Sequence, residues 1–221
     1  QNQLDANSNQ WNVNSNPKWT TRFEKSEASN WGYLPKTIVT GDGDDKVDIK
    51  MGSDGRVHVN VNGKEEWSGT PKQFAALTID TGGGKDVVRN EDDGANIVTG
   101  LGNDKVWNKA NNTNINTGAG DDVLGSEGSH NILNSEAGAD SVRVVGNDNT
   151  ISTGTGSDYL GFKGDSNRVN TGRGSDEVDG YGQGNTIQTE SGDDKVRMKY
   201  GDYIPENPIS NFIDTGAGND F

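Results

Sequence analysis

The chain has 221 residues, only 28% of them hydrophobic, with 32 glycines, no cysteine and a formal net charge of −14 at pH 7. This composition excludes disulfides and thiolate metal sites, and it means that any folded state has a thin apolar core and depends on extensive backbone pairing. The acidic charge argues against nucleic-acid binding and favours divalent cations or basic partners, and no apolar run is long enough to span a membrane.

Residues 1–37 are rich in Asn, Gln and Ser, and they contain Trp11, Trp19 and Trp31. The first residues show neither a basic region nor a hydrophobic stretch of the kind that anchors a chain to a membrane. The tryptophans are consistent with a cap over the open end of a folded domain. A flexible leader and a set of exposed rings that stack on sugars are the alternatives.

Residues 38–80 contain one irregular unit with an excursion. The segment 57–64 alternates apolar and polar residues and runs into Asn62-Gly63, which is a strong signal for a β-hairpin. Phe74, Ala75 and Leu77 are then expected to return the chain to the main body of the domain.

Residues 81–221 are dominated by the motif Thr-Gly-x-Gly-x-Asp-x-(Val/Leu), which recurs every 18 residues. Its first position is held by Thr81, Thr99, Thr117, Ser135, Thr153, Thr171 and Thr189, with further copies at Thr40 and Thr215. Each glycine would cost about 1 kcal/mol inside a helix, so the repeat predicts strands and turns. We therefore expect an all-β fold, a parallel β-solenoid with 18 residues and two short strands in each coil.

Two columns of aliphatic residues, nine positions apart, are predicted to point into the solenoid. Three-residue strands suit this pattern, because alternation turns one side chain inward and two outward. The Thr or Ser at the first motif position is expected to form a hydroxyl ladder along the stack. The first column holds Val88, Val106, Leu124, Val142, Leu160, Val178 and Val196, and the second holds Ile97, Ile115, Leu133, Ile151, Val169, Ile187 and Ile213.

The sixth motif position is aspartate in every copy. Stacking would place neighbouring carboxylates about 5 Å apart, where like charges repel by roughly 1–3 kcal/mol per pair. Carboxylates beside the carbonyl groups of a glycine-rich turn form an all-oxygen environment that suits Ca²⁺ better than zinc or copper. The alternative is that each aspartate only accepts N–H bonds within its own turn. The predicted metal ligands are Asp45, Asp86, Asp104, Asp122, Asp140, Asp158, Asp176, Asp194 and Asp220.

The segment Gly82-Gly83-Gly84-Lys85-Asp86-Val87-Val88 resembles the RTX nonapeptide, the hemolysin-type calcium-binding repeat. The resemblance covers about two thirds of the chain. It implies a β-roll that binds Ca²⁺ between adjacent coils, and it implies a secreted, extracellular protein of Gram-negative bacterial origin. Because the calcium-free chain would repel itself and bury little apolar surface, folding is expected to depend on calcium.

The second half of each repeat departs from the RTX pattern. It carries asparagine where RTX units carry a second aspartate, at Asn131, Asn149, Asn167, Asn185 and Asn211. Neutral amides can form a ladder without a cation, so calcium is expected on the aspartate side alone. Glu136 and Glu190 replace the first motif glycine in two coils, which predicts weaker or reshaped sites there.

The C-terminal part contains a second excursion near residues 200–210, with Pro205 and Pro208, which is predicted to be a loop insertion and a candidate contact site. The sequence stops at Asp220-Phe221, within a motif. This position leads us to expect a longer protein with a neighbouring domain.

No catalytic residues are predicted. His58 and His130 are far apart in the repeat, and the paired acids recur in every coil, whereas catalytic carboxylates are unique. We therefore expect a non-enzymatic, calcium-binding region that supports a neighbouring domain. The alternative is an accessory module that binds an anionic polysaccharide of an adhesin or polysaccharide-modifying enzyme. Ice binding would require regular outward rows of side chains, and the rows here are uneven. The coils are also shorter than those of the parallel β-helix polysaccharide lyases. The candidate polysaccharide contacts are Lys105, Arg143, Arg168, Arg173 and Arg197.

Overall fold

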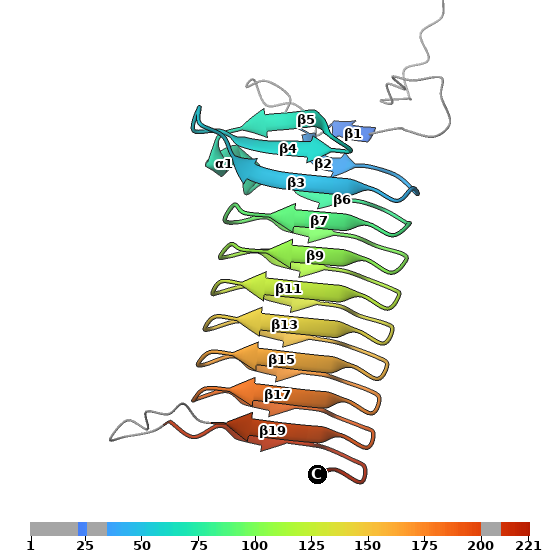
Figure 1. Cartoon of the computed structure of the whole chain (residues 1–221), viewed down its shortest axis with the longest axis vertical. Helices are drawn as coiled ribbons and strands as arrows, with labels where there is room; N and C mark the ends of the chain where they lie inside the picture. Colours follow the sequence, from blue (N-terminus) through green and yellow to red (C-terminus); the bar gives the residue numbers. More distant parts are fainter. Residues whose placement is uncertain (1–21, 26–34, 200–208) are drawn as a thin grey trace, which may run out of the picture.

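The computed structural model describes residues 22–25, 35–199 and 209–221, and it is a parallel β-solenoid, as predicted (Figure 1). Two ten-stranded sheets enclose the core. Sheet A consists, in spatial order, of β1 (Arg22–Lys25), β2 (Pro35–Val39), β6 (Thr78–Asp80), β8 (Asn96–Val98), β10 (Asn114–Asn116), β12 (Ile132–Asn134), β14 (Thr150–Ser152), β16 (Arg168–Asn170), β18 (Thr186–Gln188) and β20 (Phe212–Asp214).

Sheet B extends along the same stack, from the last coil to the N-terminal hairpin. Its strands are β19 (Lys195–Lys199), β17 (Glu177–Tyr181), β15 (Tyr159–Lys163), β13 (Ser141–Val145), β11 (Val123–Glu127), β9 (Lys105–Asn108), β7 (Val87–Asn90), β3 (Lys46–Met51), β4 (Val57–Val61) and β5 (Lys64–Gly69).

The regular coils stack in one unbroken register of 18 residues. Leu124 of β11 pairs with Val142 of β13, and Ile115 of β10 pairs with Leu133 of β12, both in parallel. Each strand therefore lies directly beneath its equivalent in the next coil. Because of this register, a residue type that recurs in the sequence forms a column in space.

Both predicted aliphatic columns line the core, except at the C-terminal end. Val88, Val106 and Ile115 have no exposed surface, and the columns remain buried as far as Val178 and Ile187. Val196 is only partly buried. Ile213 pairs in register with Ile187, as predicted for the column, but it is 43% exposed because the described structure has no further coil to cover it.

The strands of sheet B are longer than the three residues predicted, at four to six residues in each coil. The extra length brings a second inward column to this sheet. It is polar at the N-terminal end, with Asn90, Asn108 and Ser126, and apolar further on, with Val144 and Phe162. Sheet A keeps three-residue strands in the regular coils, with a single inward residue each.

The N-terminal end of sheet B is closed by an antiparallel hairpin. β4 pairs with β5 across Asn62-Gly63, as predicted, and both residues have positive φ. A helical turn that was not predicted, α1 (Pro71–Phe74), follows it; Thr70 and Gln73 form a capping box around Pro71. Phe74 and Leu77 are buried, as expected for a return to the stack, whereas Ala75 is exposed.

Two further predicted features lie outside the described residues. Trp11, Trp19 and Trp31 belong to the predicted N-terminal cap, and residues 200–208 form most of the predicted loop. His130 is exposed in a turn, with a φ of 60°.

The motif glycines are required where the turns of adjacent coils meet. Gly102 has a φ of +123°, and a Cβ atom at this position would lie 1.6 Å from the carbonyl oxygen of Gly84 in the preceding coil. Gly43, in an outer turn, would have no atom within 4 Å of an added Cβ and no positive φ. Both the backbone conformation and the packing therefore require glycine at position 102, and neither requires it at position 43.

We predict that Gly102→Ala lowers the free energy of unfolding by about 2 kcal/mol or more, because the turn must move away from the carbonyl of the preceding coil. Gly43→Ala is the matched control and is expected to change stability by about 0.5 kcal/mol or less. Thermal unfolding followed by circular dichroism measures both. Equal effects of the two substitutions would contradict the close stacking of the turns.

Candidate metal-binding column

The nine predicted aspartates form one column on the side of the solenoid where each coil passes from sheet A to sheet B; we call it the Asp column. Each lies just before a strand of sheet B or, for Asp220, at the matching position of the last coil. From Asp45 to Asp194 the residues are at most 4% exposed, and Asp220 is partly exposed. The sequence thus identified aspartates that the fold removes from bulk solvent.

Each carboxylate in the column after Asp45 accepts a hydrogen bond from the coil before it. The backbone N–H of Asp86 donates to Oδ1 of Asp104 at 2.8 Å, and the N–H of Asp104 donates to Oδ1 of Asp122 at 2.8 Å. This pattern runs from Asp45 to Asp220. The predicted alternative, an N–H donor in the same turn, is therefore wrong, because the donor comes from the adjacent coil.

The second carboxylate oxygen of most of these residues has no hydrogen-bond partner. The buried Oδ2 atoms without a partner belong to Asp86, Asp104, Asp122, Asp140, Asp158, Asp176 and Asp194. A buried, unsatisfied acceptor costs roughly 1–3 kcal/mol, and more when it is charged. The hydroxyls of Thr81 and Thr117 lie close enough to Asp86 and Asp122 to lower the pKa of these carboxyl groups, but they make no hydrogen bond to Oδ2 in this geometry.

Burial changes the acid–base behaviour of the column. It raises the pKa of Asp86, Asp140 and Asp176 to about 6, with a smaller contribution from the neighbouring carboxylates. Burial also raises the pKa of Asp122 and Asp158. These carboxylates therefore favour a proton or another cation more strongly than free aspartate does.

Asp45, the first residue of the column, differs because both of its oxygens have donors. The hydroxyl of Thr40 donates to Oδ2 at 2.5 Å, and Nδ2 of Asn62, from the hairpin turn, donates to Oδ1 at 2.6 Å. Most of the following Thr or Ser hydroxyls form the predicted ladder, in which Thr99 Oγ1 donates to the carbonyl of Thr117 at 2.9 Å. The ladder is interrupted at Thr117 and Thr171, whose hydroxyls have no hydrogen-bond partner.

The asparagines on the opposite side form a column of the same geometry, here called the Asn column, in which every amide is satisfied. The N–H of Asn131 donates to Oδ1 of Asn149 at 2.9 Å, and Nδ2 of Asn149 donates to the carbonyl of Gly128 at 3.1 Å. The predicted ladder is thus present, with the backbone as partner more often than another amide. An amide completes its hydrogen bonds in this geometry, whereas a carboxylate does not.

The two coils with glutamate in place of the first motif glycine keep the turn and the column. Glu136 and Glu190 adopt positive φ values of 64° and 60°. The following aspartates, Asp140 and Asp194, still accept the N–H bonds from the preceding coil at 2.8 and 2.9 Å. The predicted weakening of these two sites therefore has no counterpart in the backbone of the turns.

The donor set available for a metal consists of aspartate oxygens and main-chain carbonyls. Within the described ranges, no three Asp, Glu, His or Cys side chains converge on one point. A cation between two coils would therefore meet two carboxylates and complete its ligands with carbonyls or water. Hard oxygen ligands of this kind fit Ca²⁺, and the unpartnered Oδ2 atoms are the free positions.

A separate ionic cluster lies on the N-terminal hairpin. His58 Nε2 is 3.0 Å from Oδ1 of Asp54, and Nδ1 is 2.5 Å from Oε2 of Glu65. Hydrogen bonds to Asp54 and Glu65 raise the pKa of His58. This arrangement links β4, which carries His58, to Glu65 on β5 and to Asp54 in the turn that precedes β4.

The structure separates the five cations that were predicted to contact a polysaccharide. Lys105, Arg143 and Arg197 lie on the outer face of sheet B, and Arg168 lies on sheet A. Arg173 belongs to the turn on the Asp side, where its backbone bridges Thr155 and Ser191. A single extended ligand on one face therefore cannot contact all five.

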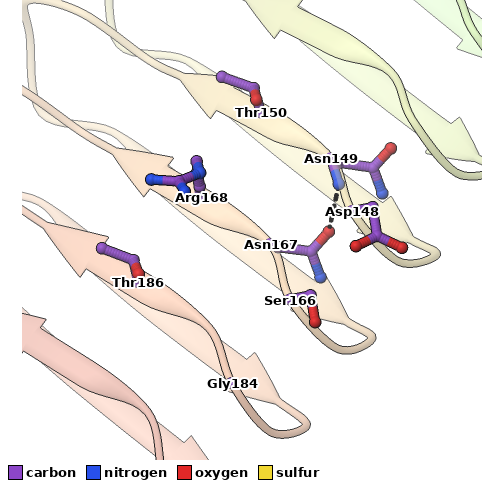
Figure 2. A pocket seen from close by; sticks show the side chains of 8 residues that line it. All are labelled: Asp148, Asn149, Thr150, Ser166, Asn167, Arg168, Gly184 and Thr186. Carbon is purple, nitrogen blue, oxygen red and sulfur yellow. Dashed lines mark hydrogen bonds between the residues drawn. The ribbon is translucent and has the colours of Figure 1, made fainter.

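The Asn side of the solenoid carries a polar hollow of about 300 Å³ (Figure 2). Arg168 and Asp148 are the charged residues of its lining, and the amides of Asn149 and Asn167 are already engaged in the Asn column. The hollow contains no residue of the Asp column. It is therefore a different site from the predicted metal positions.

Comparisons with known proteins give one partial match. A family profile described as "Protein of unknown function (DUF3060)" matches residues 127–184, which span about three coils of the stack. Neither the curated proteins nor the solved structures contain a match. Among the described residues, no helix is long and apolar enough to cross a bilayer.

Proposed function

We propose that this chain is a non-catalytic, calcium-binding solenoid module of an extracellular bacterial protein, related to the RTX repeats, which folds on Ca²⁺ and supports a neighbouring domain. The observation that carries the proposal is the row of buried Oδ2 atoms without partners. Folding without a cation would remove these carboxylates from water and would place like charges beside one another. Both the lost hydration and the charge repulsion oppose folding.

The Asn column provides an internal comparison for this argument. Both columns use the same bond from a backbone N–H to Oδ1, so the hydrogen-bonded ladder does not by itself require a carboxylate. Asparagine would fill both positions if the ladder were the only need. Aspartate in all nine motif copies supports a role for the charge.

The residues that would hold the ion are the consecutive aspartates of the column from Asp86 to Asp194, together with main-chain oxygens of the glycine turns. Bound Ca²⁺ would supply positive charge that offsets the repulsion between coils. The apolar core is thin, so this contribution would decide whether the coils stack at pH 7. Calcium concentrations outside cells would then permit folding after secretion.

We predict that chelation of calcium at neutral pH greatly reduces the β-sheet signal in the far-ultraviolet spectrum, and that calcium restores it. The measurement is circular dichroism with thermal unfolding, in chelator and in about 5 mM CaCl₂, which exceeds the dissociation constants of extracellular calcium modules. Titration calorimetry is expected to detect several Ca²⁺ ions per chain.

Magnesium at the same concentration is the control, because its stricter octahedral geometry fits a flexible carbonyl site poorly. An identical spectrum and melting temperature in chelator and in calcium would refute the proposal. A response to magnesium equal to that to calcium would replace a specific site with general charge screening.

A further inference from the structure

The outer face of sheet B has a charge opposite to that of the whole chain. In the strands from β3 to β19 its outward positions hold nine Lys or Arg and four Asp or Glu, which gives +5, whereas the chain carries −14. On the outer face of sheet A, the strands from β6 to β20 contain a single cation, Arg168. Positive charge is thus concentrated on one side of the solenoid.

Three of the four acids of this face pair with cations near its two ends, and Glu127, in the middle, has no cation of the described residues within 4 Å. Asp48 contacts Lys46 and Arg89 at one end, and Glu177 and Asp179 contact Lys195 and Arg197 at the other. In the middle coils of the described structure, no carboxylate lies within 4 Å of Lys105, Arg143 or Lys163. Lys105 and Arg143 thus have no ionic partner in the described part of the chain, whereas the ammonium of Lys163 lies 5.9 Å from the ring centroid of Tyr181.

Aromatic rings accompany the free cations. We call Lys105, Trp107, Arg143, Tyr159 and Lys163 the basic–aromatic patch; it extends over four consecutive coils. Trp107 is 39% exposed, and the guanidinium carbon of Arg89 lies 5.1 Å from its ring centroid, on the side of the preceding coil. The patch thus offers both charge and apolar ring surface.

Two glycines flank Arg143 in the central outward row, and an aromatic side chain lies over each. Gly125 lies between Trp107 and Arg143, and a Cβ atom added there would be 3.3 Å from Cδ1 of Trp107. Gly161 lies on the other side of Arg143, with the hydroxyl and ring of Tyr159 3.4 to 3.7 Å from the position of an added Cβ. Glycine at position 125 thus lets the indole of Trp107 extend over the sheet towards Arg143, which is two strands away, about 10 Å.

We propose that the basic–aromatic patch binds a linear acidic polysaccharide, with a uronate ring packed on Trp107 above Gly125 and its carboxylate on Arg143. The C–H groups of a pyranose pack well on the electron-rich face of an indole ring. The guanidinium group suits a carboxylate. The row runs along the stack for about 14 Å from β9 to β15, which fits a chain of sugars rather than one.

A polysaccharide fits this face better than nucleic acid does. DNA carries one charge per 3.4 Å of each strand, and proteins that bind it present a strongly basic domain. Here the free cations are few, acids border them, and the whole chain is acidic. A uronate polymer has a lower charge density and carries hydroxyl groups that can donate hydrogen bonds to acids such as Glu127 of β11. The proposal requires a folded solenoid, but it does not depend on which cation stabilises the Asp column.

The test is titration calorimetry of the folded chain in calcium with a hexamer of galacturonate. We expect binding that weakens at least about tenfold in Arg143→Gln. Arg168→Gln removes the same charge from sheet A and is expected to leave affinity within about twofold. Gly125→Val keeps every charge and displaces the Trp107 ring, and it is expected to weaken binding by at least about tenfold. Higher salt is expected to weaken binding.

Circular dichroism of the same samples verifies the fold, so a failure to bind is distinct from a failure of the calcium proposal. Absence of binding by a folded chain, or equal loss in Arg143→Gln and Arg168→Gln, would overturn the inference. Equal affinity for the methyl-esterified, neutral hexamer would remove the role of charge. Equal affinity for an oligothymidylate of the same length would make the patch a general polyanion surface.

Discussion

In the absence of calcium, the melting temperature of the chain is expected to rise when the pH is lowered from about 7.5 to about 5, and in saturating calcium it is expected to fall over the same interval. The opposite directions follow from the two cations that compete for the buried carboxylates. A proton can neutralise each group when calcium is absent, whereas acid displaces calcium when it is bound.

The sign follows from the pKa shifts. Burial raises the pKa of Asp86, Asp140 and Asp176 to about 6, above the ordinary aspartate value of 3.8. The native state therefore binds protons more tightly than the unfolded state, and the stability that protonation supplies is complete below about pH 3.8 and lost as the pH rises through about 6. One pKa unit corresponds to about 1.4 kcal/mol, so the calcium-free melting temperature is expected to change by about 5 °C or more.

Thermal unfolding at several pH values, in chelator and in calcium, measures this effect. At the pH where the chelated chain is too unfolded to melt cooperatively, the fraction folded by circular dichroism takes the place of the melting temperature. Parallel pH dependences under the two conditions would show that proton and metal do not share the column.

Conversion of three central aspartates to asparagine, Asp104→Asn, Asp122→Asn and Asp140→Asn together, is expected to make folding largely independent of calcium. Asparagine keeps the Oδ1 acceptor for the N–H of the preceding coil and replaces the unpartnered Oδ2 with a donor, as in the Asn column. Removal of each buried charge is expected to stabilise the chelated chain by roughly 1–3 kcal/mol.

The matched control changes three exposed acids, each of which directly precedes an aspartate of the column: Asp44→Asn, Asp121→Asn and Asp193→Asn. Each of these also accepts a backbone N–H from a neighbouring coil, so the control removes the same charge and keeps the same kind of hydrogen bond. It is expected to preserve most of the response to calcium. If the control abolishes that response as fully as the column variant does, net charge and not the buried column explains the effect of calcium.

The sequence determined most of the architecture, since the 18-residue period is visible without coordinates. In a parallel stack each residue lies on its equivalent in the next coil, so the identity of the columns follows from counting. The aliphatic columns, the Asp and Asn columns and the threonine ladder were predicted for this reason. The Asn62-Gly63 hairpin was predicted from local turn chemistry.

The tertiary structure determined the contacts that the side chains of each column make. The sequence did not reveal that Oδ1 of each aspartate accepts an N–H from the preceding coil and leaves Oδ2 alone, because this depends on how far one turn is displaced over the next. The sequence also did not reveal that Arg143 and Arg168 lie on different faces of the molecule. The repeat period places them in different strands, but only the closed coil puts these strands in two different sheets.

The burial of residues at the end of the stack, and the contacts between unlike residues of neighbouring coils, also depend on the tertiary structure. Ile213 fits the aliphatic column by register but is exposed, because burial requires a coil on both sides. Trp107, Gly125 and Arg143 have no shared motif, and they form one surface only because three coils place them in a single outward row. A repeat fixes which positions are stacked; the side chains that differ from coil to coil acquire their roles from the surface that the stack creates.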